Sequence, residues 1–347
     1  MSTVPPTPGG GGAPPLSIGL PVYNGERFLA QAIDALLAQT YPEFELIISD
    51  NASTDSTAEI CRSYVERDAR IRYVRQPVNI GAAPNHNFVF AQARGRYFKW
   101  ASHDDLYAAD LLRLCVEALE TRPDVVLAHA WDAFIDEHGK VIRPLIYLLD
   151  TASPRPPARL RSLLYGSGGN DIYGVIRTEV FRRVGPLGSY HNADRCFVAA
   201  LSLQGPFYQV PRMLYFRRDH PDRGERASTR RARSANLDPR RADRVRNPMI
   251  RLHTEYVRGY VAAIYQAPLS RADRYRCLIH VAGWLLSHLR PGATRRLLDS
   301  SDPAVLARAE QTLASHARLV SPLLFTGSRR RRASGSGPRE ADDRDAS

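Results

Sequence analysis

Residues 17–57 read SIGLPVYNGERFLAQAIDALLAQTYPEFELIISDNASTDST, and two short apolar runs frame an amphipathic segment in this stretch. The first run, 16–20, is typical of a buried strand. Asn24 is in position to cap the following helix, where apolar residues recur at three- and four-residue spacing. The second run, 44–49, ends at Asp50. The stretch therefore predicts a strand, a helix and a second strand.

The same alternation continues further along the chain. Helices are predicted at 53–67, 85–93 and 106–119, and strands at 71–75, 96–100 and 125–131. Repeated βα units predict a mostly parallel sheet with helices on both faces. Ligands of such sheets bind at the carboxyl ends of the strands, where Asp50, Asp104 and Asp105 fall.

The composition is that of an ordinary globular protein of 347 residues, with 44% hydrophobic and 24% charged residues. Its four cysteines form no CxxC pair, which indicates buried free thiols without a metal site or a disulfide framework. The start shows no apolar leader, and 277–289 is shorter than the roughly 20 residues that span a bilayer. We expect a cytoplasmic protein, with a peripheral position at the inner face of the membrane as an alternative.

The net charge is +12, and only two of the 48 basic residues are lysines. Eleven arginines against five acidic residues lie between 217 and 246. Such a stretch suits a phosphate-rich ligand, an anionic membrane surface or nucleic acid, and it is equally typical of a solvated loop.

Composition and pattern divide the chain into five segments. The termini are polar or rich in proline and glycine, which predicts disorder. Between them we expect a catalytic domain, an arginine-rich mobile loop and a helical C-terminal region. The boundaries are 1–15 (tail), 16–216 (catalytic domain), 217–247 (loop), 248–326 (helical region) and 327–347 (tail).

A nucleotide would have to be bound here without a glycine-rich phosphate loop. The only glycine run, 9–12, precedes the first strand, whereas such a loop follows a strand and opens a helix. A divalent cation held by carboxylates is the alternative way to neutralise phosphates. Asp104 and Asp105 provide those carboxylates, and a simple helix-capping role is the competing interpretation.

Residues 17–57, together with 79–105 (NIGAAPNHNFVFAQARGRYFKWASHDD), resemble the family 2 glycosyltransferases. The resemblance covers roughly residues 16–215. It implies an A-type nucleotide-sugar-binding fold, here followed by a helical C-terminal extension. It also implies an inverting glycosyltransferase, of the hexosyltransferase type, that moves a sugar from a nucleotide diphosphate sugar to an acceptor hydroxyl with Mn²⁺ or Mg²⁺.

The resemblance also implies roles for single residues. The expected donor-binding residues are Pro21, Val22, Tyr23, Glu26, Asp50, Asn51 and Asp104, with Asp50 at the base edge and Asn51 able to share that contact. We expect Asp105 on the metal and Asp104 on the ribose or a metal-bound water. Ser102 stands where the family usually has a further aspartate, so the division between Asp104 and Asp105 stays open.

Two later segments match the acceptor and phosphate sides of the family's site. Asp194, at the start of the segment NADRCF, matches the general base, with helix capping as the alternative and His191 as a nearby competitor. Arg217 and His220 match a segment that contacts the diphosphate or the metal. The arginine-rich loop that follows is interpreted as a lid over bound donor.

Two other functions compete with this one. A nucleotidyltransferase would carry a glycine-rich, lysine-containing signature after the first strand, and none is present. A nucleic-acid-binding protein would interleave aromatics with its arginines, and 221–246 contains no aromatic residue, so we expect no nucleic-acid partner.

The sequence leaves the acceptor open among a cell-surface glycan, a lipid-linked sugar and a small natural product. The apolar stripes of the C-terminal region predict packing on the catalytic domain or on another copy, as in a homodimer. Contact with a membrane through Tyr275, Leu278, Trp284 and Leu285 is the alternative.

Overall fold

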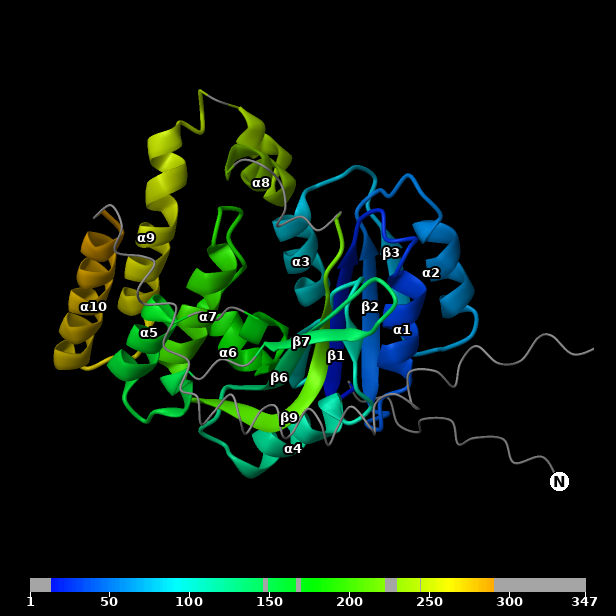
Figure 1. Cartoon of the computed structure of the whole chain (residues 1–347), viewed down its shortest axis with the longest axis horizontal. Helices are drawn as coiled ribbons and strands as arrows, with labels where there is room; N and C mark the ends of the chain where they lie inside the picture. The colour runs from blue at the N-terminus through cyan, green and yellow to red at the C-terminus, as the bar shows by residue number, and fades with distance from the viewer. Residues whose placement is uncertain (1–13, 146–148, 167–169, 222–229, 244, 290–347) are drawn as a thin grey trace, which may run out of the picture.

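The computed structural model describes residues 14–145, 149–166, 170–221, 230–243 and 245–289. Within them the first half of the chain (Figure 1) forms β1 (Leu16–Val22), α1 (Leu29–Leu37), β2 (Phe44–Asp50), α2 (Thr57–Val65), β3 (Ile71–Arg75), α3 (Ala82–Ala91), β4 (Tyr97–Trp100), β5 (Leu106–Tyr107) and α4 (Leu111–Thr121). The second half forms β6 (Leu127–Ile135), β7 (Val141–Leu145), α5 (Pro156–Tyr165), β8 (Val175–Arg177), α6 (Thr178–Val184), α7 (Ala193–Gln204), β9 (Phe207–Arg218), α8 (Arg230–Leu237), α9 (Met249–Gln266) and α10 (Arg271–Leu289). The tail expected at 327–347, most of the tail expected at 1–15 and the helical region expected beyond residue 289 lie outside the described residues.

Strand β1 is the centre of the N-terminal half of the sheet. It pairs in parallel with β2 on one side and with β4 on the other, and β2 pairs in parallel with β3. Every residue of β1 and β2 is buried, as expected of strands covered by helices on both faces. The parallel βα arrangement predicted from the sequence is confirmed for this half.

The C-terminal half makes the sheet mixed. The strand order is β3-β2-β1-β4-β8-β6-β9-β5, with β7 on β6. Strand β8 is antiparallel to both of its neighbours, whereas β6 and β9 are parallel. Leu106 and Tyr107, which we expected to begin a helix, form β5 because they pair with Phe216 and Tyr215 of β9. Apolar spacing could not reveal a pairing partner so distant in the sequence.

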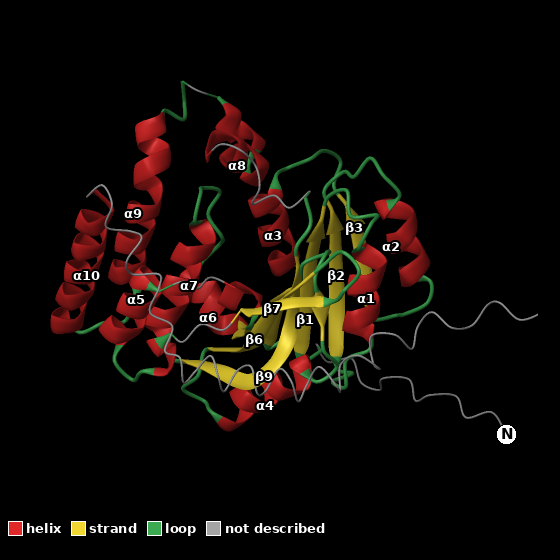
Figure 2. Ribbon diagram, in the orientation of Figure 1, coloured by secondary structure: helices red, strands yellow, loops and turns green. Residues whose placement is uncertain are grey.

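Helices cover both faces of the sheet (Figure 2). One apolar cluster joins α1, α2 and α4 to one face, and a second joins α3, α5, α6 and α7 to the other. Helix α1 begins at Leu29, later than the position of Asn24 predicted. Asn24 has a positive φ of 50°, and its side-chain oxygen accepts from the backbone N–H of Thr54 at 2.9 Å, so it bonds the neighbouring loop instead of capping the helix.

The C-terminal helices α9 and α10 pack on the preceding α/β domain, which is one of the two arrangements expected. Tyr260, Ile264, Cys277, Val281 and Trp284 are buried in the same cluster as α7. Within the expected mobile loop 217–247, residues 230–237 form α8, whose sequence RRARSANL is rich in helix-forming residues. In the part of the chain that the structure describes, we find no helix of the length and apolarity that a membrane crossing requires.

A buried carboxylate, Glu45 of β2, ties three segments together. It accepts from the Ser17 hydroxyl at 2.7 Å and from the Arg94 guanidinium at 2.7 and 3.0 Å. Burial alone would raise the pKa of the Glu45 carboxyl, but the hydrogen bonds from Arg94 and Ser17 outweigh it and hold that pKa below its usual range.

We predict that Glu45→Gln lowers the free energy of unfolding at pH 7 by about 1–2 kcal/mol, since it removes a charged acceptor. A carboxyl whose folded pKa is depressed stabilises the fold above its unfolded pKa, near 4.5 here, and loses that effect as pH falls through the folded value. The difference in unfolding free energy between parent and variant, measured by urea unfolding, should therefore be smaller at pH 3 than at pH 7. The exposed Glu66→Gln variant is the control, and an equal difference at both pH values would contradict the assignment.

Candidate active site

A cavity of about 660 Å³ opens where the first strands of the sheet end. Its wall comes from the segments that follow β1, β2 and β4, from helix α3, and from the region around α8. Ligands of open α/β sheets bind at this edge. Among the residues predicted from the sequence, those that line the cavity are Pro21, Val22, Tyr23, Asn51, Asp104 and His220.

The loops after β1 and β2 are held together by hydrogen bonds between them. The backbone N–H of Gly25 donates to the Thr57 hydroxyl at 2.8 Å, and that of Glu26 donates to Asp55 at 3.0 Å. The Glu26 carboxylate in turn accepts from the Ser56 N–H at 3.1 Å. Asp55 also accepts from the N–H of Thr57, the first residue of α2, at 3.1 Å. Glu26 therefore braces the two loops and is not among the residues that line the cavity.

Asp50 and Asn51 are adjacent in sequence but occupy different environments. Asp50 is fully buried, and its carboxylate accepts from the Ser53 N–H at 2.8 Å and the Tyr73 hydroxyl at 2.9 Å. Asn51 lines the cavity, and its amide donates to the side chain of Asn79, another lining residue, at 2.9 Å. Asp50 thus supports the cavity wall from behind, and Asn51 forms part of its surface.

Asp104 carries the carboxylate that borders the cavity. One of its oxygens accepts from the Ser102 hydroxyl, and the other lies 3.0 Å from Nε2 of His220. The His220 ring packs against Phe28, with 5.0 Å between ring centroids, so its orientation is fixed. Nδ1 of His220 is buried without a hydrogen-bond partner in the described part of the chain.

Gly25 allows the first loop to approach the Asp104 segment closely. A Cβ atom at this position would lie 2.6 Å from the Val22 side chain and 3.0 Å from Cδ2 of His103, which also lines the cavity. Any side chain at position 25 would displace one of these neighbours. This close packing explains why residue 25 is a glycine.

Asp105 points away from the cavity into the protein. It is 1% exposed, and its carboxylate accepts from the Tyr215 hydroxyl and, at 2.9 Å, from the backbone N–H of Arg218. Both partners belong to β9, so Asp105 fastens the loop after β4 to the last strand. The sequence predicted Asp105 on the metal, but it is Asp104 that lines the cavity.

Lys99 lies beneath this loop as a fully buried cation. Its ammonium donates to the backbone oxygen of Tyr173 and lies 5.1 and 5.5 Å from the ring centroids of Tyr107 and Tyr215. Burial lowers the pKa of Lys99 to about 8. Tyr107 donates to the Ser102 oxygen and Tyr215 to Asp105, so the lysine packs under both supports of the loop.

The two arginines that end β9 face opposite sides of the strand. Arg218 is fully buried, and its guanidinium donates to the backbone oxygens of Asp104 at 2.8 Å and Glu137 at 2.6 Å. Arg217, the expected diphosphate contact, lies over the Phe134 ring and is not among the residues that line the cavity. Arg27, which no sequence motif indicated, does line it. Neighbouring side chains of a strand point to opposite faces, so the sequence could have predicted that only one of Arg217 and Arg218 faces the loop.

Helix α8 and the turn after it close one side of the cavity through Ala235, Asn236 and Pro239. Gly81, at the start of α3, has a φ of 91°, and a Cβ atom there would lie 2.6 Å from the Leu237 oxygen. The glycine thus permits both the backbone turn and the contact with α8. Part of the arginine-rich segment is therefore a wall of the site.

Asp194 is exposed in the first turn of α7 and is not among the residues that line the cavity. The loop that leads to α7 is nevertheless fixed to a helix that does line it. The Asn87 side chain of α3 donates to the Leu187 oxygen and accepts from the Leu187 N–H, both at 2.8 Å. This two-point contact sets the position of the start of α7 relative to the cavity.

The sequence matches known proteins over its N-terminal half. Residues 17–184 match the family described as Glycosyl transferase family 2. An uncharacterized glycosyltransferase of Haemophilus influenzae is 35% identical over 130 residues, which cover 38% of this chain and 52% of that protein. Glycosyltransferase GlyG of Streptococcus pneumoniae is 29% identical over 118 residues, or 34% of this chain and 39% of that protein. The matched segments thus span about half of these relatives or less.

The fold is shared with a solved structure over most of the chain. TarS 1–349 of S. aureus, determined in complex with UDP-GlcNAc, superimposes with a TM-score of 0.60 at 16% identity, covering 89% of this chain and 82% of that one. This similarity confirms the predicted α/β fold of the A-type glycosyltransferases, a sheet flanked by helices with further helices at the C-terminal end.

We predict that Asp105→Asn costs about 2–4 kcal/mol of unfolding free energy, because it leaves a buried amide donor against the Tyr215 hydroxyl and Arg218. Asp104→Asn should cost about 1 kcal/mol or less, since an amide oxygen still accepts at the cavity edge. Urea unfolding followed by circular dichroism measures both. If Asp104→Asn lost as much unfolding free energy as Asp105→Asn or more, Asp105 would not be the carboxylate that stabilises the fold.

Proposed function

Residues 17–184 match Glycosyl transferase family 2, and from this premise we propose that the protein transfers a sugar from a nucleotide diphosphate sugar to an acceptor hydroxyl. The observation that carries the proposal is the cavity at the strand ends, with the Asp104 carboxylate and the His220 imidazole on its wall. A carboxylate and an imidazole beside a cavity of nucleotide size suit a phosphate-bound cation. No observation favours a second function.

The nucleotide base is assigned to the end of the cavity formed by the loops after β1 and β2. Tyr23 is 45% exposed there and offers a ring face for stacking. The linked amides of Asn51 and Asn79 border the same region and offer polar groups to a base edge. Asp50 is buried behind this wall, so its proposed effect on base binding is indirect, through the loop that it holds in place. The shared fold with TarS, whose structure was determined in complex with UDP-GlcNAc, supports a nucleotide sugar as the donor class.

The residues at the cavity edge fit a divalent cation. The described residues contain no cluster of three or more histidine, cysteine or acidic side chains that could hold a metal unaided. A cation between Asp104 and His220 would therefore take further ligands from donor phosphates and water. A mixed oxygen and nitrogen set of this kind suits Mn²⁺ better than Mg²⁺. When bound, the cation neutralises charge on the leaving diphosphate.

Arg27 is the proposed cationic neighbour of the leaving diphosphate, whereas Arg217, which the sequence indicated for that contact, is not among the residues that line the cavity. Arg27 lines the cavity, where it is held by an ion pair with Glu137 at 2.5 Å. Arg218 is not expected to contact the diphosphate, because its guanidinium donates hydrogen bonds to backbone oxygens inside the protein. Its task is to hold the Asp104 segment in place.

We predict that Asp104→Ala abolishes the stimulation of donor hydrolysis by Mn²⁺, a loss of at least about 100-fold given the several kcal/mol that a catalytic cation supplies. A panel of UDP-, dTDP- and GDP-sugars, assayed with and without Mn²⁺, needs no acceptor. Asp124→Ala removes an exposed aspartate away from the cavity and is the matched control. Full Mn²⁺-dependent hydrolysis by Asp104→Ala would show that Asp104 is not a ligand of the cation.

The reaction proposed is a single displacement with inversion at the anomeric carbon, and it requires a general base for the acceptor hydroxyl. Asp194 is the proposed base. Its exposure in the first turn of α7 and the Asn87–Leu187 contact with α3 support this role. The competing role is a purely structural one at the helix N-terminus, where a negative charge is favourable.

We predict that Asp194→Asn leaves donor affinity close to that of the parent and lowers single-turnover transfer by about 10²–10⁴-fold, the usual worth of a positioned base. Asparagine keeps the size of the side chain and its ability to cap, so a structural role would cost only a few tenths of a kcal/mol. Calorimetry and quenched-flow transfer measure the two quantities. Transfer within about threefold of the parent rate would redirect the assignment to His191.

A further inference from the structure

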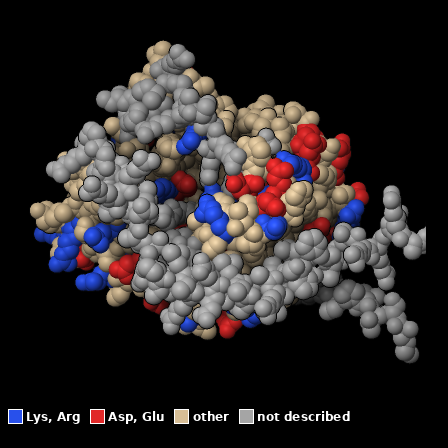
Figure 3. Space-filling view, viewed as in Figure 1, with Lys and Arg blue, Asp and Glu red and all other residues tan. Residues whose placement is uncertain are grey.

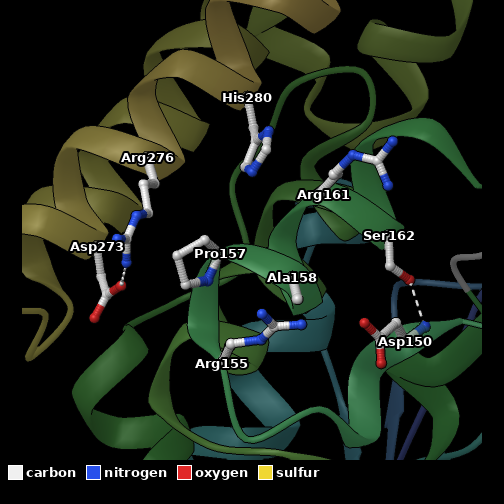
Figure 4. A pocket seen from close by; sticks show the side chains of 9 residues that line it. All are labelled: Asp150, Arg155, Pro157, Ala158, Arg161, Ser162, Asp273, Arg276 and His280. Atoms are coloured by element: carbon white, nitrogen blue, oxygen red, sulfur yellow. Dashed lines mark hydrogen bonds and ion pairs between the residues drawn. The ribbon is translucent and has the colours of Figure 1, made fainter.

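A second cavity, of about 540 Å³, lies between α5 and α10, outside the candidate active site. Figure 4 shows its lining side chains, with Arg276 and His280 from α10 facing Arg155 and Arg161 from the start and the middle of α5. We call it the α5–α10 groove. The remaining lining residues are Asp150, Pro157, Ala158, Ser162 and Asp273.

The groove carries positive charge that the described residues do not neutralise. Arg155 and Arg161 form no ion pair with any carboxylate in the described part of the chain. Asp273 is already bonded to Arg276 at 3.1 Å and to the Ser270 hydroxyl at 2.8 Å. Burial and the charge of Arg161 both lower the pKa of His280. Three arginines against the two aspartates, Asp150 and Asp273, leave the lining with a net positive charge, which favours an anionic ligand.

The outer face of α10, next to the groove, is apolar. Tyr275, Ile279 and Leu286 are 67%, 51% and 62% exposed, and their spacing sets them on one side of the helix. We call these three residues the α10 stripe. The opposite side of α10, with Cys277, is buried in the core. Of the four residues for which the sequence suggested membrane contact, Tyr275 is exposed, whereas Leu278, Trp284 and Leu285 pack inward.

We propose that the outer face of α10 and the α5–α10 groove dock onto an anionic lipid membrane surface. Phosphate headgroups would occupy the groove, and the α10 stripe would enter the boundary between headgroups and acyl chains. A lipid surface is the one occupant that offers both anions and an apolar phase, as for interfacial helices with basic and apolar faces. Arginine side chains gather over α10 at the left edge of Figure 3. The net charge of +12 adds long-range attraction to an anionic bilayer.

The same observations disfavour other occupants. Free phosphate would fill the groove but leave the stripe exposed to water. A second copy of the chain would cover the stripe but would bring the same arginines toward their counterparts, which like-charge repulsion opposes. The proposal is independent of glycosyl transfer, because it concerns a surface away from the candidate active site.

The experiment is co-sedimentation of the full chain with vesicles of phosphatidylcholine alone or mixed with phosphatidylglycerol. We expect binding only to the anionic vesicles, weakened by salt. Arg155→Gln with Arg161→Gln should weaken it about 30-fold, and Ile279→Ser with Leu286→Ser should weaken it by at least tenfold. Arg62→Gln with Arg67→Gln is the matched control, since it removes the same charge from exposed positions in α2 and just after it, at the far end of the molecule (Figure 1).

The outcomes separate the alternatives. Loss of binding in both groove and stripe variants, with the α2 control unchanged and all melting temperatures near the parent's, supports the proposal. Equal binding by all variants overturns it, as does failure of the full chain to sediment with anionic vesicles. Millimolar inorganic phosphate that binds the groove without lipid, or a dimer in sedimentation velocity that Ile279→Ser dissociates, also overturns it. Donor hydrolysis is not part of the assay, so an inactive enzyme would not affect the result.

Discussion

The Asp105 carboxylate is the point on which the candidate site depends. It joins the loop after β4 to β9 through the Tyr215 hydroxyl and the Arg218 backbone N–H. These two residues are more than a hundred positions away in the sequence, so the loop is held by the last strand of the sheet. With Asp105 directed inward, Asp104 is directed toward the cavity, where it meets His220 just beyond the end of β9. One buried acceptor thereby sets the positions of two side chains on the cavity wall.

Burying this carboxylate is costly, and the surroundings offset the cost with cations and hydrogen bonds. Lys99 packs beneath the loop against Tyr107 and Tyr215, and Arg218 donates to the backbone of the loop itself. These groups face inward and are fully buried. The cavity side of the same loop is left with groups that can exchange partners, namely Asp104, His220 and the nearby His103. The loop after β4 is thus held by buried polar contacts on its inner side, and its outer side faces the cavity, where a ligand could bind.

The cavity and the α5–α10 groove lie in different parts of the molecule (Figure 1). The β1–β4 half provides most of the cavity wall, because its parallel strands all end at one edge. The later helices approach that cavity from the side, and the Asn87–Leu187 contact fixes their distance from it. Helix α10 lies at the end of the molecule opposite α2, and together with α5 it carries a charged groove and an apolar face. On our proposals the donor site and the membrane contact occupy opposite sides of the core shared by α7 and α9.

The sequence by itself determined the α/β fold, the parallel first half and the edge of the sheet at which the cavity opens. Local patterns suffice for this, because burial on both faces makes β1 and β2 continuous apolar runs and the motifs follow directly after them. Local patterns did not reveal β5, the inward direction of Asp105, the difference between Arg217 and Arg218, or which face of α10 is exposed. Each of these depends on a partner distant in the chain: Phe216 for Leu106, Tyr215 for Asp105, Phe134 for Arg217, and the α7 cluster for Trp284. Sequence spacing records the period of an element, but only the folded chain decides which side of that element meets a neighbour.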